Sequence, residues 1–325
     1  MAKGIIVAIC SLLFLLASPL YLAEAGGGLR YDFYKTSCPG LELLVKKEVA
    51  RIYYIHGNAA ISFIRNAFHD CAVQGCDASL LLESLPGQPG EKVSEHNTGM
   101  RNFKYVDEIK AAVEKACPGV VSCADIIILS GRDGVAMLGG PQFKVKTGRR
   151  DTRHFSLAAV DATLLPQDAD VTTFLKLIGS FNLNIPQAVA LIGAHTVGRT
   201  HCKTLVKRLY PKVDPTLNYA YSYYLKKRCP TPNPSPSAVL YSRNDPITPM
   251  KFDNNYFKNV MQMKGLLKLD NALYLDPRTK PYVVKMAQDN NYFYAQFVEG
   301  MSILTEYKVL TGLQGEIRKQ CRWVN

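Results

Sequence analysis

The sequence predicts a single all-α domain, and three features lead to this prediction. Apolar residues recur at helical spacing in many segments, whereas the alternating pattern of a half-buried strand is scarce. Residues typical of helix starts precede several of these segments. The chain also has no internal repeat and no flexible interdomain linker, so its length fits one large domain with an ample core.

The first 25 residues are expected to be a signal peptide rather than part of the fold. Lys3 precedes a nearly all-apolar run at residues 5–16, and the small residues before Gly26 fit a cleavage site. A signal anchor is the alternative, but the run is short for a membrane span and no other segment is long and apolar enough. We therefore expect a secreted mature domain at residues 26–325 without a membrane segment.

Helical signals then follow in order along the mature chain. Apolar spacing predicts helices over residues 42–54, 59–69, 103–113, 126–129, 186–195, 283–290 and 293–304. The stripe that begins at Phe103 stops at residues 117–119, which read Cys-Pro-Gly. Ser122 and Asp125 fit a capping box ahead of the next helix. Pro186 suits a first helical turn.

Residues 65–79 form the most informative stretch of the chain. Arg65 and His69 are four residues apart, so they share one face if this segment is helical. A guanidinium beside an imidazole can move a proton while it stabilises developing negative charge. Asp70, Asp77 and Ser79 follow and offer oxygen ligands of the kind that calcium takes. Taken separately, the pair also fits a structural role and the oxygen cluster a solvated turn.

A second histidine, His195, ends an apolar helical run, so its ring is expected to face inward. It is either a hydrogen-bonded core residue or a ligand to iron in a buried cofactor. The second role needs an acceptor on the other ring nitrogen, and Asp270 is a candidate. Residues 245–253 form another oxygen-rich loop, which Thr196 would complete. Two histidines, each beside such a loop, suggest two halves that face one cofactor.

Charge and cysteine content set limits on partners and compartment. Cleavage removes Lys3 and Glu24, one residue of each sign, so the net charge stays at +12. Nucleic acid is not expected as a partner of a secreted chain whose charges are spread along its length. Anionic cell-wall polysaccharide is the more natural partner, and a solvated basic surface without a partner is equally open.

Eight cysteines outside the signal peptide imply four disulfides, with 105 pairings open.

These features resemble the class III secretory plant peroxidases over the whole mature sequence. The distal block of that family, Arg-x-x-Phe-His-Asp-Cys-x-Val-x-Gly-Cys-Asp-x-Ser, stands here at residues 65–79. The proximal Gly-x-His-Thr-x-Gly block stands at residues 193–198, and further blocks match at residues 121–125, 148–151, 310–312 and 315–318. The resemblance implies a haem peroxidase fold, with one haem b between a distal and a proximal helical half.

The resemblance also implies an activity and a set of roles. The enzyme would reduce hydrogen peroxide and oxidise small phenolic donors in two one-electron steps, through a high-valent iron intermediate, as a monomer in the apoplast or cell wall. The implied catalytic and cofactor residues are Arg65 and His69 for peroxide cleavage, Phe68 at the haem edge, Asn97 as the group that makes His69 more basic, His195 as axial iron ligand, Asp270 as its hydrogen-bond acceptor, and Pro166 in substrate binding.

The resemblance further places two calcium ions and the disulfide pairs. The distal calcium ligands would be Asp70, Val73, Gly75, Asp77 and Ser79, with Glu91 acting through water, and the proximal ligands Thr196, Asp245, Thr248, Lys251 and Asp253. The implied disulfides are Cys38–Cys117, Cys71–Cys76, Cys123–Cys321 and Cys202–Cys229.

The chain departs from the family pattern at several positions. Ala72 and Asn244 stand where aromatic or apolar residues are usual, and the segment at residues 91–101 is one residue shorter. Asp168 and Asp170 would make the substrate rim acidic, from which we expect poor turnover of anionic phenols. An alternative function is a calcium-stabilised cationic wall-binding protein with weak or no peroxidase activity. A haem enzyme that makes hydroxyl radicals would share the same site.

Overall fold

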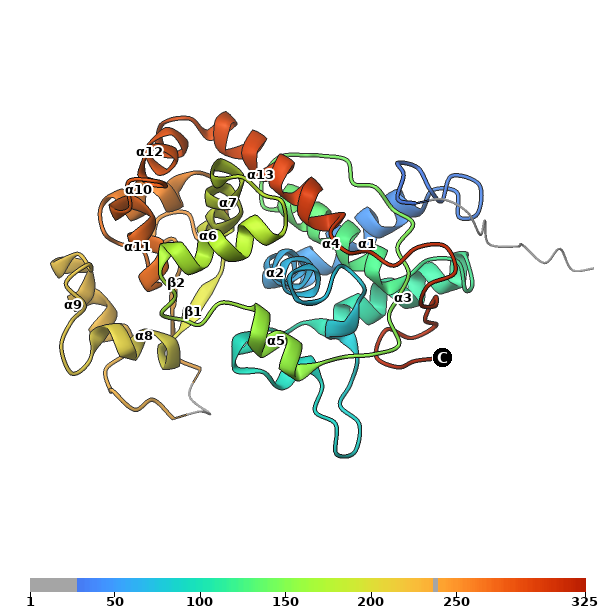
Figure 1. The fold of residues 1–325 in the computed structure, drawn as a ribbon, viewed down its shortest axis with the longest axis horizontal. Coiled ribbons are helices and arrows are strands. Elements are labelled where there is room, and N and C mark those ends of the chain that lie inside the picture. The colour runs from blue at the N-terminus through green and yellow to red at the C-terminus, as the bar shows by residue number, and fades with distance from the viewer. Residues whose placement is uncertain (1–27, 236–238) are drawn as a thin grey trace, which may run out of the picture.

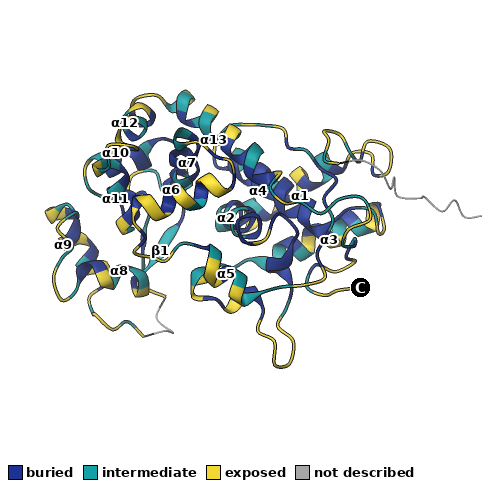
Figure 2. Cartoon of the chain, in the orientation of Figure 1, coloured by how far each residue is buried: buried dark blue, intermediate teal, exposed yellow. Residues whose placement is uncertain are grey.

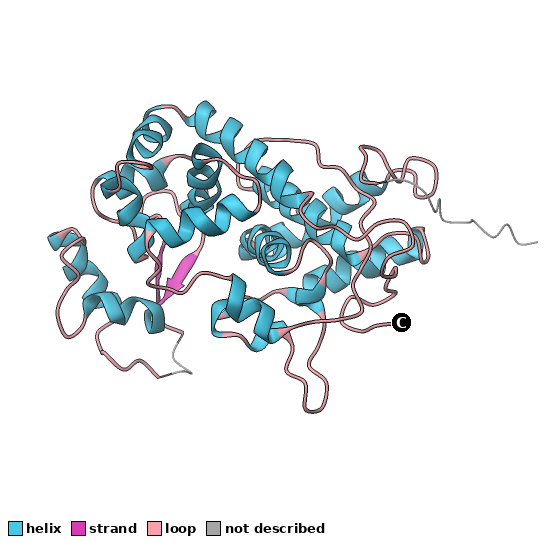
Figure 3. Ribbon diagram, in the orientation of Figure 1, coloured by secondary structure: helices cyan, strands magenta, loops and turns pink. Residues whose placement is uncertain are grey.

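The regular structure of the protein, in a computed structural model, is almost entirely helical (Figure 3). Residues 28–235 and 239–325 are described, so the expected signal peptide lies outside the described residues. Within those ranges the strands are two segments of three residues, β1 (Arg199–His201) and β2 (Tyr241–Arg243). They pair antiparallel with Arg199 opposite Arg243. The all-α prediction is therefore confirmed apart from this short ribbon.

Thirteen α-helices are found in the described part of the chain (Figure 1). They are α1 (Leu41–Ile55), α2 (Asn58–Val73), α3 (Phe103–Ala116), α4 (Cys123–Met137), α5 (Leu157–Thr163), α6 (Val171–Ser180), α7 (Ile185–Ile192), α8 (Cys202–Leu209), α9 (Tyr219–Arg228), α10 (Asn255–Met261), α11 (Lys268–Leu275), α12 (Lys280–Gln288) and α13 (Asn290–Thr305). No single described helix is long and apolar enough to cross a membrane; α6 and the segment Ile185–Thr196 reach that length only together, with a bend of 107°.

Helix α4 forms the centre of the first half and is buried along nearly its whole length (Figure 2). Helix α2 packs against it through small residues. A Cβ at Gly134 would lie 2.7 Å from the carbonyl oxygen of Ala60, so only glycine allows this close approach. Helices α1 and α3 also pack on α4. The predicted stripe on α3 is confirmed, because Val106, Ile109 and Val113 are all buried.

The start of α4 corrects one prediction. Ser122 does cap the helix, since its hydroxyl accepts a hydrogen bond from the backbone N–H of Asp125 at 3.1 Å. Asp125 does not return the bond, so the predicted capping box is wrong. Its buried carboxylate instead accepts hydrogen bonds from Tyr34 Oη at 2.8 Å and from Arg149 Nη1 at 2.7 Å. The carboxylate is therefore committed to a tertiary ion pair.

The second half is built from α7 and α10–α13 around an aromatic core. Phe252, Phe257, Phe293 and Phe297 are all buried there and contact one another ring to ring. Pro186 lies in the first turn of α7, as predicted. However, α7 ends at Ile192, and His195 lies on a separate 3₁₀ turn, Gly193–Thr196. The predicted helix through His195 is therefore too long by one turn.

A smaller unit projects beside this half (Figure 1). Helices α8 and α9 form a hairpin with a hydrophobic cluster of its own, made of Cys202, Leu205, Leu209, Leu217, Tyr221, Leu225, Cys229 and Leu266. The disulfide Cys202–Cys229 joins the start of α8 to the end of α9. The other disulfides are Cys38–Cys117, Cys71–Cys76 and Cys123–Cys321, so all four implied pairs are formed.

Candidate functional site

A cavity of about 340 Å³ lies between the two halves. Arg65, Phe68 and His69 of α2 line one wall, and His195 with its neighbours lines the other. Pro166 lies at its rim and is exposed. The structure therefore brings together the two histidine-bearing segments, which are 126 residues apart (69 to 195) in the sequence.

The pair Arg65 and His69 has the geometry that its spacing predicts. Arg65 Nε donates to His69 Nε2 at 3.0 Å. The other guanidinium nitrogens of Arg65 donate to the carbonyls of His96 and Thr98 at 3.3 and 3.2 Å, which fix its plane. Burial and the nearby Arg101 charge lower the pKa of Arg65 to about 10, so it stays charged at neutral pH.

Asn97 determines which nitrogen of His69 carries the proton. Its Nδ2 donates to the carbonyl of Glu91 at 2.8 Å, so its Oδ1 faces His69 Nδ1 at 2.7 Å. That oxygen only accepts, so His69 Nδ1 holds the hydrogen and Nε2 keeps its lone pair. Burial and the Arg65 charge hold the pKa of His69 well below its usual value. His69 is thus a neutral base that faces the cavity.

His195 is oriented from behind by a buried carboxylate. Its Nδ1 lies 2.9 Å from Asp270 Oδ1, which also accepts a hydrogen bond from Tyr256 Oη at 2.9 Å. The backbone N–H of Leu267 donates to Asp270 Oδ2 at 2.7 Å. Burial alone would raise the pKa of Asp270, but the contact with His195 and these donors lower it. The ring therefore turns its Nε2 toward the cavity, as an iron ligand requires.

A group of basic side chains in the cavity was not found from the sequence. Arg101, Arg199 and His201 line it together with Arg65. Burial and the charges of Arg199, Arg101 and Arg65 lower the pKa of His201. Arg199 Nε and His201 Nε2 are buried and have no hydrogen-bond partner among the described residues. The two carboxylates of a haem would satisfy these donors, so the residues present fit the cofactor that the resemblance implies.

Two of the predicted distal calcium residues, Asp70 in the last turn of α2 and Asp77 in the segment after it, lie close enough to interact. Burial and the charge of Asp77 raise the pKa of Asp70 well above its usual value, which places two buried carboxylates close together. Ser79 Oγ is buried and has no hydrogen-bond partner within the described ranges. Burial and Asp77 likewise raise the pKa of Glu91 to about 7. A hard cation at this point would relieve the repulsion and satisfy the hydroxyl.

The backbone between these residues is shaped for the same site. Val73 ends α2, and Gly75 adopts a φ of +127°. A Cβ at Gly75 would lie 2.2 Å from the carbonyl oxygen of Lys308, so glycine is required there.

The predicted proximal calcium residues also meet. Thr248 Oγ1 lies 2.7 Å from Asp245 Oδ2 and 3.2 Å from Asp253 Oδ1, and Thr196 Oγ1 lies 3.4 Å from that same Asp253 oxygen. The backbone N–H of Lys251 donates to the carbonyl of Thr248 and closes the loop. Among the described residues, no group of three or more His, Cys, Asp or Glu side chains is placed to hold a metal ion. The donor set is instead two carboxylates with hydroxyl and carbonyl oxygens, which suits calcium.

The departures from the family pattern have structural explanations. Ala72 is fully buried. Asn244 links the ribbon to the His195 segment, since it accepts from Thr200 Oγ1 at 2.8 Å and donates to the carbonyl of Val197 at 3.2 Å. Asp168 and Asp170 are exposed and do not line the cavity, whose charged walls are mainly cationic. The acidic rim and the poor turnover of anionic phenols therefore stay predictions about the entrance beside Pro166 and not about the cavity walls.

Comparison with known proteins gives a consistent result over nearly the whole chain. The family model described as Peroxidase matches residues 45–289. Peroxidase 21 of Arabidopsis thaliana is 55% identical over 301 residues, which cover 92% of each chain. Peroxidase 42 of the same plant is 47% identical over 324 residues, covering 99% of this chain and 98% of that relative. Cationic peroxidase SPC4 of Sorghum bicolor is 39% identical over 298 residues, covering 90% and 81%.

Proposed function

The chain belongs to the peroxidase family, and from this premise we propose that Arg65 and His69 cleave hydrogen peroxide in the cavity opposite His195. The protein is a secreted plant peroxidase that takes one haem and two calcium ions and uses hydrogen peroxide with a reducing substrate. The wall-binding alternative without activity is not favoured by these relatives. The observation that carries the proposal is that Asn97 keeps His69 Nε2 unprotonated, so that this nitrogen faces the cavity as an acceptor, 3.0 Å from the donor Arg65 Nε.

The proposed acid–base chemistry uses one nitrogen twice. His69 Nε2 takes a proton from one oxygen of the peroxide and returns it to the other, which leaves as water. Arg65 stabilises the negative charge that builds up on the leaving oxygen. A bound haem would supply the two electrons for this reduction and would recover them one at a time from the reducing substrate.

The remaining groups hold this geometry. His195 would be the axial ligand, with Asp270 making its ring more electron-rich. Phe68 shields the cavity, and Pro166 with its neighbours meets the reductant, which we infer to be a small phenol. Arg199, His201 and Arg101 would hold the haem carboxylates. Asp70, Val73, Gly75, Asp77 and Ser79, with Glu91 through water, would bind one calcium ion, and Thr196, Asp245, Thr248, Lys251 and Asp253 would bind the other.

Organisation and location complete the proposal. Residues 1–25 would be removed, which leaves one haem peroxidase domain at residues 26–325. This domain would act as a monomer in the apoplast or cell wall, with the wall's anionic polysaccharide as a binding partner and without nucleic acid or membrane. The support is the signal-type leader, the four disulfides and the secreted relatives.

A steady-state assay tests the catalytic part of the proposal. The haem- and calcium-loaded domain should oxidise guaiacol only when hydrogen peroxide is added. His69→Leu should slow this by about 10²–10⁴-fold, the usual worth of a positioned acid–base group. His154→Leu, at an exposed histidine outside the cavity, is the matched control and should leave the rate unchanged. Equal rates in all three proteins, at equal haem content, would contradict the proposal.

A further inference from the structure

Positive charge is concentrated in one short segment of the chain, residues 199–229. This tenth of the sequence holds eight Lys and Arg residues and one Asp, so it carries seven of the twelve net positive charges. The expectation that the charges are spread along the length is therefore wrong. The segment comprises β1 and the α8–α9 hairpin, which projects from the molecule (Figure 1). The hairpin thus presents a local field rather than a diffuse one.

Four of these eight basic residues are free to meet an external anion. The one acidic residue, Asp214, is committed to the buried Arg208, whose Nε lies 2.8 Å from its carboxylate. Lys207, Lys212 and Lys227 are exposed and Lys226 is half-buried. These four lysines have no carboxylate partner among the described residues.

The outer face of α9 adds aromatic rings to these charges. Tyr219, Tyr223, Lys226 and Lys227 are spaced i, i+4, i+7 and i+8, so they share one face of the helix. Tyr219 is 90% exposed and Tyr223 is 63% exposed, although the opposite face of α9 is buried. The ammonium group of Lys227 lies 4.6 Å from the centre of the Tyr223 ring. The face therefore presents two flat rings followed by two cations over about 12 Å, at 1.5 Å per residue.

This face is held rigidly. The hydrophobic cluster between α8 and α9 and the disulfide Cys202–Cys229 fix the hairpin. The backbone N–H of Asn218, the cap of α9, donates to the carbonyl of Met263 at 2.9 Å and ties the hairpin to the main body. A preorganised surface loses little entropy when it binds an extended ligand.

We propose that the hairpin surface, defined as Lys207, Lys212, Tyr219, Tyr223, Lys226 and Lys227, binds an anionic, uronate-rich polysaccharide. The lysines would pair with the uronate carboxylates, and the tyrosine rings would pack against the C–H faces of the sugars. The inference rests on the proposed function in one respect, because a secreted enzyme meets such polymers rather than nucleic acid. None of the six residues lines the cavity, so a bound polymer would leave the active site open.

The test measures binding of the haem-loaded protein to immobilised polygalacturonate at several salt concentrations. The variant Lys207→Gln/Lys212→Gln/Lys226→Gln/Lys227→Gln should bind at least tenfold more weakly. By the counterion-release reasoning developed for polyanions, its slope of log affinity against log salt should be smaller by about 3. The control Lys35→Gln/Lys47→Gln/Lys115→Gln/Lys144→Gln removes four exposed lysines elsewhere and has the same net charge. It should bind like the native protein.

Further probes separate the roles of charge and rings. Fully methyl-esterified polygalacturonate should not bind. Tyr219→Ser/Tyr223→Ser should weaken binding without changing the salt slope. In the native protein, polygalacturonate should slow amide exchange in α8 and α9, a readout that needs no variant to fold. Guaiacol oxidation should be the same in the lysine variants as in the native protein. If the native protein bound polygalacturonate but did not oxidise guaiacol, only the catalytic proposal would fail.

Two results would overturn the inference. Equal weakening by both lysine variants would mean that net charge rather than this surface binds the polymer. Equal affinity for polyuridylate and polygalacturonate, without an effect of the tyrosine substitutions, would mean a general polyanion surface with no selectivity for sugar.

Discussion

At the scale of single residues, the proposed base His69 depends on Asn97, which contacts the ring nitrogen opposite the proposed catalytic one. Asn97 leaves His69 Nε2 unprotonated through one hydrogen bond, and its own orientation depends on the carbonyl of Glu91. Asn97→Leu removes the oxygen that accepts the hydrogen bond from His69 Nδ1 and leaves a side chain of nearly the same size. We expect peroxide cleavage to slow about 10–100-fold, the usual effect of losing such an orienting partner.

The control for this change is Asn97→Asp, which keeps an acceptor oxygen next to His69 Nδ1. Its pH–rate profile should move to higher pH, because the added negative charge raises the pKa of His69. A purely structural role for Asn97 would leave that profile in place and change only the haem content.

Residue-level prediction from sequence succeeded where spacing carries geometry. Arg65 and His69 were placed on one face by their separation of four, and α2 confirms this. The partner of His195 was only a candidate, because 75 residues separate it from Asp270 and the fold alone brings them together. Arg199 and His201 were missed because they lie in β1, a strand of only three residues after the proximal block, which is too short to show a sequence pattern. The signal that points to them, a buried donor without an acceptor, exists only in three dimensions.

At the scale of elements, the oxygen-rich loops connect catalytic segments to the rest of the fold. Asp70 directly follows His69, and Thr196 directly follows His195. Removing calcium with a chelator should therefore displace both histidines and lower the melting temperature. At free calcium about 100-fold above Kd, each site contributes about 2.7 kcal/mol.

Calcium added back should restore both the melting temperature and the Soret band. Magnesium should not, because it needs a tighter octahedral oxygen set. An unchanged melting temperature after complete chelation would mean that neither loop binds calcium.

The hairpin offers a prediction about pH. Burial would raise the pKa of Asp214, but hydrogen bonds from Thr216 and Arg208 hold it below the usual 3.8. A carboxylate with a lowered pKa stabilises the fold above pH about 4 and loses this effect as the pH falls further. Asp214→Asn should therefore lower the melting temperature at pH 6, and the difference from the native protein should shrink toward pH 3. A difference that stays constant over this range would contradict the account.

Element prediction from sequence was best for long helices with a clear apolar stripe. Helices α1, α2, α3 and α13, which have 14–16 residues, were predicted close to their observed bounds. Helices α5, α6 and α8–α11 have only 7–10 residues, so a stripe is sampled over two or three turns at most. In α9 the exposed tyrosines also mask the pattern. These short helices depend on tertiary contacts, which the local sequence does not carry.

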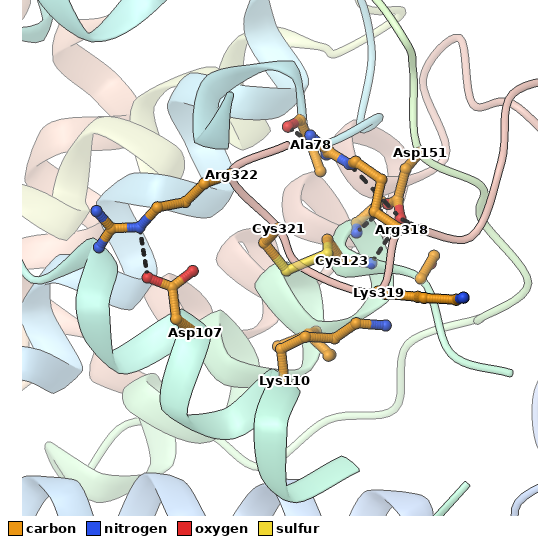
Figure 4. Close-up of a disulfide and its surroundings, with 12 residues drawn as sticks. Ala78, Asp107, Lys110, Cys123, Asp151, Arg318, Lys319, Cys321 and Arg322 are labelled. Carbon is orange, nitrogen blue, oxygen red and sulfur yellow. Dashed lines mark hydrogen bonds and ion pairs between the residues drawn. A yellow bond between two sulfur atoms is a disulfide. The ribbon is translucent and has the colours of Figure 1, made fainter. Parts of the chain in front are cut away.

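At the scale of the whole molecule, the C-terminal segment holds the distal half together (Figure 4). Asp151 accepts hydrogen bonds from the backbone N–H groups of Cys123 and Arg318, at 3.0 and 2.9 Å. Arg318 in turn donates to the carbonyl of Ala78, inside the distal oxygen-rich loop. Three sequence blocks that the resemblance matched without a role, at residues 121–125, 148–151 and 315–318, are thus parts of one structural joint.

The disulfide Cys123–Cys321 closes this joint across 198 residues, whereas Cys202–Cys229 spans 27. In the chain-entropy model, their removal lowers the free energy of unfolding by about 5 and about 3.5 kcal/mol, respectively. Replacing each pair by alanine and comparing guanidinium midpoints tests this order. Only the first change should also weaken calcium binding, because only it loosens the distal loop. The opposite order would mean that the C-terminal segment contributes little.

The central claim is that Arg65 and a neutral, correctly oriented His69 cleave peroxide in the assembled cavity. Stopped-flow absorbance of the haem- and calcium-loaded protein, mixed with hydrogen peroxide alone, tests it most directly. We predict a fast loss of Soret intensity that returns on addition of guaiacol and is slowed by about 10²–10⁴-fold in His69→Leu. A normal ferric spectrum with an equally sluggish reaction in the native protein and in His69→Leu would contradict the account.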